Sequence, residues 1–96
     1  MNGLSKFEEK NPPISKQVIL YTTHYCPHCT RAKALLKRKG IRFQEIDVTE
    51  DPQKREEVEQ RYGWMTVPII VIGDRCIGGA QELYELERKG ELASLL

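Results

Sequence analysis

Apolar residues occur along the chain in short runs separated by longer amphipathic stretches. Residues 18–21 and 68–72 are continuous apolar runs rich in β-branched side chains, which predicts strands covered on both faces. Residues 41–48 and 75–77 are also predicted to be strands, from their β-favouring content and short length. The Gly-Asp pair at 73–74 predicts a turn that joins the last two strands in a hairpin.

Three amphipathic stretches predict helices over about residues 27–39, 52–62 and 80–89. Proline opens the first two, at a position where its missing N–H would have no partner, and glycine follows all three. One more helical turn is expected over residues 91–96.

The predicted order of elements is β-α-β-α-β-β-α. A strand–helix–strand opening requires a crossover, so the first two strands should be parallel, and the hairpin adds an antiparallel pair. The pattern therefore predicts an α/β fold with a four-stranded mixed sheet flanked by helices. Residues 1–16, with a Pro-Pro pair and no clear period, are expected to form a flexible N-terminal extension to a single domain over residues 17–96.

Composition narrows the classes of function. The 96 residues are 40% hydrophobic and 30% charged, an ordinary balance for one globular domain. A net charge of +1 gives no sign of a nucleic-acid-binding surface. The longest strongly apolar run is too short to cross a bilayer, and the N-terminus lacks the apolar region of a secretory signal. We therefore expect a cytoplasmic monomer without nucleic-acid or membrane partners.

Cys26 and Cys29 carry the candidate chemistry. Cys26 falls at an exposed helix start, where unpaired N–H groups and the helix dipole favour a thiolate, so we expect its pKa to lie well below the ordinary value of about 8.5. Cys29 follows one helical turn later on the same face. Cys26 should attack a disulfide and Cys29 should resolve the product. Half of a zinc site is the alternative, but zinc usually takes four ligands and Cys76 stands alone.

Residues near this pair have two interpretations each. His28 is either a hydrogen-bond donor to the Cys26 thiolate or an exposed side chain that shapes the site. The basic residues within 31–39, which have no acid among them, form either a solvated helix face or a docking surface for an acidic partner. Cys76 is most simply a small strand residue, with a regulatory thiol as the alternative.

Two backbone features suggest a binding surface. A proline at a strand start leaves the N–H and carbonyl of Val67 free to pair with an extended chain. Gly78 and Gly79, which precede a helix, offer free N–H groups to a carboxylate, or simply form a turn.

Several motifs together resemble the dithiol glutaredoxins, a family with the thioredoxin fold. They are Tyr21-Thr22, Cys26-Pro27-His28-Cys29, the stretch 31–36, Thr66-Val67-Pro68, and Ile77-Gly78-Gly79 followed by Leu83. The resemblance covers about residues 17–96. It excludes thioredoxin itself, whose site usually has a tryptophan before the first cysteine.

The resemblance implies a cis peptide before Pro68 and a glutathione groove beside Cys26. The implied glutathione-binding residues are Thr66, Val67, Pro68, Gly79, Ala80 and Gln81. Glutathione would be the co-substrate, without a metal or organic cofactor. Members of the family reduce protein–glutathione mixed disulfides and protein disulfides, and some supply electrons to ribonucleotide reductase.

The chain departs from the family pattern at residues around this groove. Thr23 stands where lysine is common, Trp64 where a basic or polar residue is frequent, and Gln81 where an acidic residue is usual. His28 replaces the usual aromatic residue, so Pro27, His28 and Thr23 together are expected to shape this site. Loss of two charged contacts predicts about tenfold weaker recognition of glutathione with unchanged thiol chemistry.

Two other functions are compatible with the resemblance. Weaker carboxylate contacts would suit an electron donor that thioredoxin reductase reduces in place of glutathione. An iron–sulfur carrier would bind its cluster through Cys26 and glutathione between two subunits. Such relatives usually have glycine at the position of Pro27 and a single cysteine, which argues against this second function.

Overall fold

The computed structural model describes residues 16–96. Its elements are β2 (Val18–Thr22), α1 (Pro27–Arg38), β3 (Gln44–Asp47), α2 (Pro52–Tyr62), β4 (Ile69–Ile72), β5 (Arg75–Gly78), α3 (Ala80–Arg88) and the 3-10 turn η1 (Ala93–Leu95). The predicted N-terminal extension, apart from Lys16, lies outside the described residues.

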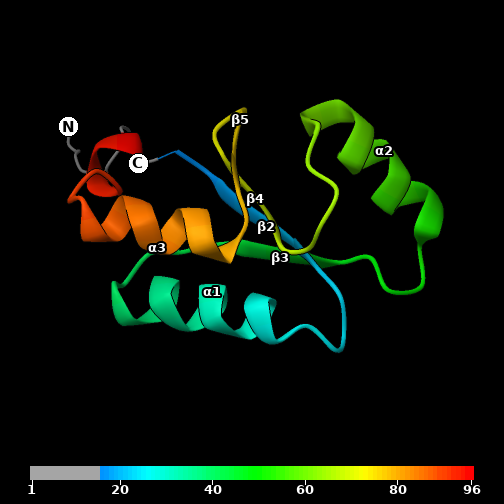
Figure 1. The fold of residues 1–96 in the computed structure, drawn as a ribbon, viewed down its shortest axis with the longest axis horizontal. Helices are drawn as coiled ribbons and strands as arrows, with labels where there is room; N and C mark the ends of the chain where they lie inside the picture. Colours follow the sequence, from blue (N-terminus) through cyan, green and yellow to red (C-terminus); the bar gives the residue numbers. More distant parts are fainter. Residues whose placement is uncertain (1–15) are drawn as a thin grey trace, which may run out of the picture.

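The four strands form one mixed sheet in the order β3-β2-β4-β5. β2 is parallel to β3 and antiparallel to β4, and β4 and β5 form the antiparallel hairpin. Helices α1 and α3 pack on one face of the sheet and α2 on the other (Figure 1). The predicted α/β fold, with its four-stranded mixed sheet and flanking helices, is confirmed.

The two central strands differ in how fully they are buried. All four residues of β4 are buried, because Ile70 and Ile72 join the core beneath α1 and α3 while Ile69 and Val71 pack on the side of α2. In β2 only alternate residues are buried. The prediction that β2 is covered on both faces was therefore only partly right, since α2 covers its second face incompletely.

Element boundaries differ from the predicted ones most at β3. This strand begins at Gln44, not at Ile41. The Ile41 N–H donates to the Leu36 carbonyl at 2.9 Å, so this residue still belongs to the turn that ends α1. The C-terminal turn is confirmed, but it is a 3-10 turn.

Two of the five basic residues within 31–39 have acidic partners elsewhere in the fold. Lys33 Nζ lies 3.0 Å from Glu45 on β3, and Lys39 Nζ lies 2.8 Å from Glu87 on α3. A hydrogen bond from buried Thr22, together with Lys33, lowers the pKa of Glu45. These contacts favour a structural role for this part of the helix face over a docking surface.

Candidate active site

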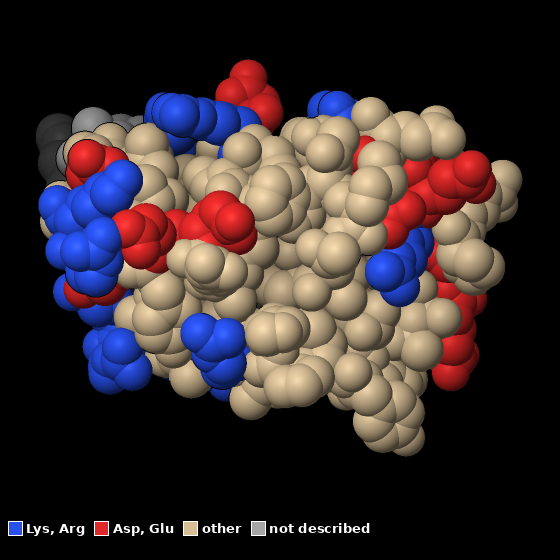
Figure 2. Space-filling view, in the orientation of Figure 1, with Lys and Arg blue, Asp and Glu red and all other residues tan. Residues whose placement is uncertain are grey.

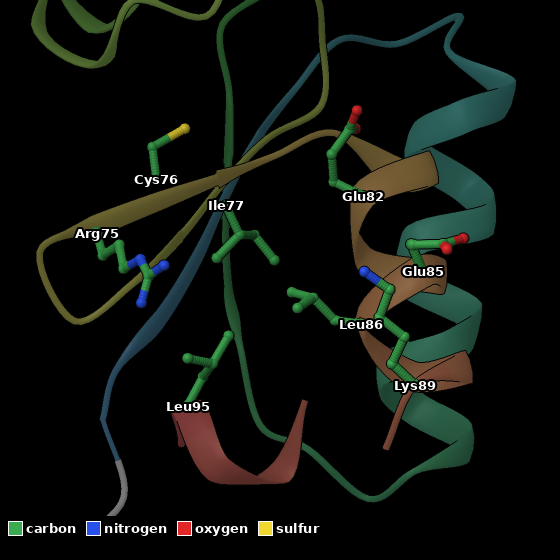
Figure 3. Close-up of a pocket in the computed structure, with 8 residues that line it drawn as sticks. All are labelled: Arg75, Cys76, Ile77, Glu82, Glu85, Leu86, Lys89 and Leu95. Atoms are coloured by element: carbon green, nitrogen blue, oxygen red, sulfur yellow. The ribbon is translucent and has the colours of Figure 1, made fainter. Parts of the chain in front are cut away.

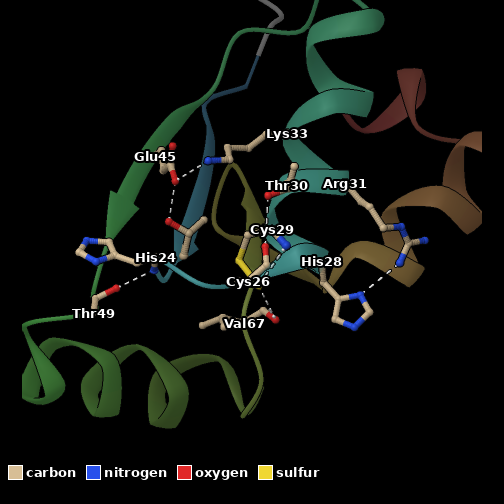
Figure 4. The surroundings of a disulfide bond; sticks show 11 residues. His24, Cys26, His28, Cys29, Thr30, Arg31, Lys33, Glu45, Thr49 and Val67 are labelled. Carbon is tan, nitrogen blue, oxygen red and sulfur yellow. Dashed lines mark hydrogen bonds and ion pairs between the residues drawn. A yellow bond between two sulfur atoms is a disulfide. The ribbon is translucent and has the colours of Figure 1, made fainter.

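Cys26 is the residue that caps the N-terminus of α1, directly after the central strand β2. Its backbone is extended, and its sulfur accepts a hydrogen bond from the Cys29 N–H at 3.0 Å. The two cysteines form a disulfide, with their Cα atoms 5.1 Å apart (Figure 4). A sulfur thus takes the place of the usual oxygen cap, and the first turn of α1 directs an N–H group at it.

The two sulfurs differ in their access to solvent. Cys26 retains 9% of its exposure and Cys29 only 1%. The expectation of an exposed Cys26 was therefore too strong, because the chain before β4 covers it and the Val67 carbonyl oxygen lies 3.6 Å from its sulfur. The order of accessibility still favours Cys26 as the attacking thiol.

A groove of about 340 Å³ is lined by Val67, whose carbonyl oxygen lies 3.6 Å from the Cys26 sulfur, although Cys26 itself is not among the lining residues. All six residues implied for glutathione binding line it: Thr66, Val67, Pro68, Gly79, Ala80 and Gln81. The peptide bond between Val67 and Pro68 is cis, as the resemblance implies. Thr23, in contrast, is not among the residues that line this groove. The groove has the size of a small-ligand site.

The start of α3 forms one end of this groove. The Gly79 N–H is not free, because it donates to the Glu82 carboxylate at 3.0 Å. The expectation of free N–H groups at both glycines was therefore wrong for Gly79. The amides of Ala80 and Gln81 lie in the first turn of α3 and have no partner within the helix. These two amides, at the positive end of the helix dipole, can bind a carboxylate.

His28 also lines the groove, but it points away from the disulfide. Its side chain is exposed, and Nδ1 lies 3.1 Å from the Arg31 guanidinium (Figure 4). The alternative in which His28 is an exposed residue that shapes the site is therefore favoured over a donor to Cys26.

Trp64 is a groove residue that the sequence marked only as a departure from the family pattern. Its ring packs beside Gly78 and Gly79 and against the hydrophobic cluster beneath α2. A tryptophan four residues before the cis-proline and a Gly-Gly pair later in the chain were the available signals. The sequence did not indicate that the two would meet.

Cys76 lies apart from the disulfide. It borders a cavity of about 280 Å³ between β5 and α3, with Ile77 and Leu86 (Figure 3). Burial raises the pKa of its thiol, and the Glu82 carboxylate adds to this effect. These surroundings favour a small, unreactive strand residue. Within residues 16–96, no three His, Cys, Asp or Glu side chains are grouped so that they could hold a metal ion, and no helix is long and apolar enough to span a membrane.

Alkylation of the reduced protein should separate its three thiols. At pH about 6 an ordinary thiol is less than about 1% ionised, but the Cys29 N–H and the start of α1 favour the Cys26 thiolate. Iodoacetamide should therefore label Cys26 first. Cys29 should react slowly because it is buried, and Cys76 should need a higher pH than an ordinary thiol does, because its pKa is raised. Peptide mapping over a pH series measures this order. Earlier labelling of Cys76 would contradict it.

These features define a class of protein. A dithiol one helical turn apart, at the start of a helix that follows the central strand of a thioredoxin-like sheet, is built for thiol–disulfide exchange.

Comparison with known proteins identifies the family to which the chain belongs. The glutaredoxin family model matches residues 18–77. A glutaredoxin of Pseudomonas aeruginosa is 49% identical over 79 residues, which are 82% of this chain and 94% of that protein. The solution structure of glutaredoxin from Brucella melitensis has a TM-score of 0.79 and 49% identity, covering 90% of this chain and 94% of the other. A crystal structure of a buckwheat glutaredoxin–glutathione complex has a TM-score of 0.79 and 30% identity, covering 84% and 76%. The chain therefore belongs to the glutaredoxin family, whose members are thiol–disulfide oxidoreductases.

Proposed function

We propose that this protein is a glutathione-dependent oxidoreductase that reduces protein–glutathione mixed disulfides and protein disulfides through Cys26 and Cys29. One observation carries the proposal: the six residues implied for glutathione binding line a single groove, and one of them, Val67, contacts the Cys26 sulfur through its carbonyl oxygen. Glutathione acts as co-substrate, and the reaction needs no metal or organic cofactor. The protein acts as a cytoplasmic monomer on glutathionylated or disulfide-bearing proteins, including ribonucleotide reductase.

The reaction begins with attack by the Cys26 thiolate on the glutathionyl sulfur of a mixed disulfide. A Cys26–glutathione disulfide forms, and the substrate protein leaves as a thiolate. A second glutathione thiolate then attacks the glutathionyl sulfur, which releases glutathione disulfide and restores the Cys26 thiolate. The Cys29 N–H and the dipole of α1 stabilise that thiolate when it forms and when it leaves.

Protein disulfides require both cysteines. Attack by Cys26 joins the two proteins by a mixed disulfide and releases one substrate thiolate. Cys29 then attacks the Cys26 sulfur, so the substrate leaves fully reduced and the Cys26–Cys29 disulfide remains. Two molecules of glutathione reduce this disulfide and become glutathione disulfide.

The groove supplies two kinds of contact for the glutathionyl group. The backbone of Val67, beside the Cys26 sulfur, can pair with the extended cysteine residue of glutathione. The backbone N–H groups of Ala80 and Gln81 can donate hydrogen bonds to the γ-glutamyl carboxylate. The crystal structure of the buckwheat relative in complex with glutathione supports glutathione as the ligand.

A coupled assay tests the source of electrons. We expect glutathione, glutathione reductase and NADPH to sustain reduction of a glutathionylated peptide, followed as NADPH oxidation. Thioredoxin reductase with NADPH should support less than about a tenth of that rate, because the reduced dithiol of the reductase itself would have to reach the mostly buried Cys26–Cys29 disulfide. Turnover with thioredoxin reductase alone would replace this proposal by the alternative donor function.

A further inference from the structure

Two large apolar side chains are exposed in the chain segments that surround the disulfide. Tyr25, which directly precedes Cys26, is 95% exposed, and Met65 is 57% exposed. Met65 stands two residues before Val67, whose carbonyl oxygen lies 3.6 Å from the Cys26 sulfur. A single exposed apolar residue is ordinary, but these two are the exposed large apolar side chains of residues 16–96, and both belong to segments that contain or contact one reactive sulfur. We call Tyr25 and Met65 the apolar rim.

The loop that carries Tyr25 is fixed to the sheet. The His24 N–H donates to the Thr49 hydroxyl at 2.8 Å (Figure 4), and the His24 ring lies 3.3 Å from the Asp47 carboxylate. The Tyr25 ring meets the His24 ring edge-on, with the ring centres 6.3 Å apart. Tyr25 is therefore exposed on an anchored loop, and a partner that covers it does not first have to order that loop.

Disulfide exchange itself brings a substrate chain to the apolar rim. When Cys26 forms a mixed disulfide with a protein, the two Cα atoms come within about 7 Å of each other. Each neighbour of the target cysteine is then one more Cα step of about 3.8 Å away, and Tyr25 is one such step from Cys26. The residues beside the target cysteine therefore come within reach of the Tyr25 ring. Neither rim residue lines the groove proposed for glutathione, so a small disulfide that fills only the groove does not have to cover the rim.

The surface around the apolar rim favours apolar neighbours of the target cysteine. Figure 2 shows few charged side chains around the starts of α1 and α3. Tyr25 offers an aromatic face and Met65 a flexible thioether, and both pack well against large apolar side chains. A polar neighbour would lose its water there without gaining a charged partner from the rim.

From this juxtaposition we propose that the apolar rim is a docking surface for disulfide-bearing proteins and selects target cysteines that have large apolar neighbours. The inference rests on the proposed reduction of protein disulfides and names the substrate class of that reaction.

A competition between two peptide disulfides tests the inference. Each is the symmetric disulfide of a five-residue peptide with blocked ends and a central cysteine, flanked on both sides by leucine in one peptide and by asparagine in the other. The variant Cys29→Ser with Cys76→Ser keeps Cys26 as its only thiol. The Cys26 thiolate attacks one sulfur, the peptide S–S bond breaks, and one half remains on Cys26 while the other leaves as a thiolate.

Mass spectrometry at early time points gives the ratio of the two adducts, and the same ratio in urea corrects for the intrinsic reactivity of the peptides. We expect the corrected ratio to favour the leucine peptide about fivefold, which corresponds to about 40 Å² of apolar surface removed from water. Adding Tyr25→Ser should reduce the preference to less than about twofold, whereas Tyr25→Phe should keep it. Met65→Gln should about halve it. Lys37→Ser, in the last turn of α1, is the control and should leave it unchanged.

Glutathione disulfide distinguishes failure of the inference from failure of the proposed function. Its reaction with Cys26 should change by less than about twofold in Tyr25→Ser and Met65→Gln. If it forms an adduct no faster with the folded than with the unfolded chain, the proposed function fails. If it does react faster, the inference alone is overturned by a corrected peptide preference below about twofold, or by a Tyr25→Ser variant that retains more than half of the preference.

A second copy of this chain is the other occupant that an apolar surface could have. Sedimentation of the native protein and of Tyr25→Ser at equal concentrations tests this occupant, and we expect a monomer in both cases. A native dimer that Tyr25→Ser dissociates would overturn the inference, because the rim would then be covered by the chain itself.

Discussion

Replacement of Cys26 by serine is expected to lower every disulfide-exchange activity by at least about three orders of magnitude, because a hydroxyl cannot serve as the attacking thiolate. Cys29→Ser should behave differently with different substrates. It should retain most activity on a glutathionylated peptide, since a second glutathione completes that reaction. It should lose more than about nine-tenths of its activity on an intramolecular protein disulfide, where Cys29 must release the product.

The structure supports this division of roles, because the two cysteines differ in how much of each is exposed to solvent. The Cys26 sulfur contacts the carbonyl of the groove residue Val67 and keeps some exposure, whereas Cys29 is almost completely buried. Steady-state rates with the two substrates provide the measurement. Cys76→Ser, which changes a thiol in a separate cavity, is the control and should match the native protein. Equal losses for Cys26→Ser and Cys29→Ser on the glutathionylated peptide would show that the roles are assigned wrongly.

Replacement of Gly78 by alanine is expected to lower the free energy of unfolding by about 3 kcal/mol. Gly78 has a φ of +110°, which L side chains rarely adopt, and a Cβ atom there would lie 2.9 Å from Cγ of Glu82 and 3.0 Å from the Trp64 ring. Backbone strain and overpacking therefore act together at this one position. The groove should be disturbed as well, because Trp64 and Glu82 both line it.

Gly40 provides a matched control for the strain alone. Its φ is +72°, but nothing lies within 4 Å of the position that a Cβ atom would occupy. Gly40→Ala should therefore cost only about 1 kcal/mol. Urea unfolding of both variants gives the comparison. If Gly78→Ala and Gly40→Ala lower the free energy of unfolding equally, then Trp64 and Glu82 move aside without cost. Only the backbone conformation would then require glycine at position 78.

Local patterns were sufficient for most of the secondary structure. Asp51 and Pro52 predict the start of α2, where the Asp51 carboxylate accepts the Lys54 N–H at 3.1 Å, and Gly63 ends the helix in a left-handed conformation. The spacing of Cys26 and Cys29 likewise predicts two thiols one turn apart at a helix start. These features depend on residues within one turn of each other, so a single segment contains the information.

Patterns of burial were less reliable, because they depend on which elements cover a face. The apolar run of β4 is fully buried as predicted, but in the similar run of β2 only alternate residues are buried. The predicted β3 was too long, since Ile41 is used to end α1. In both cases the outcome depends on neighbours that the run itself does not specify.

The shape of the groove could not be predicted from the sequence, because it depends on the tertiary structure. Its walls come from three separated segments, around His28, Trp64 to Pro68, and Gly79 to Glu82, which the sheet and α3 bring together. The family resemblance named six of these residues, but it did not place Trp64 on the Gly-Gly backbone or the Glu82 carboxylate on the Gly79 N–H. The chain's own pattern carries the cysteine chemistry, because that chemistry needs one helix start. The fit and charge of the surface beside it depend on contacts between residues far apart in sequence, and only the tertiary structure decides them.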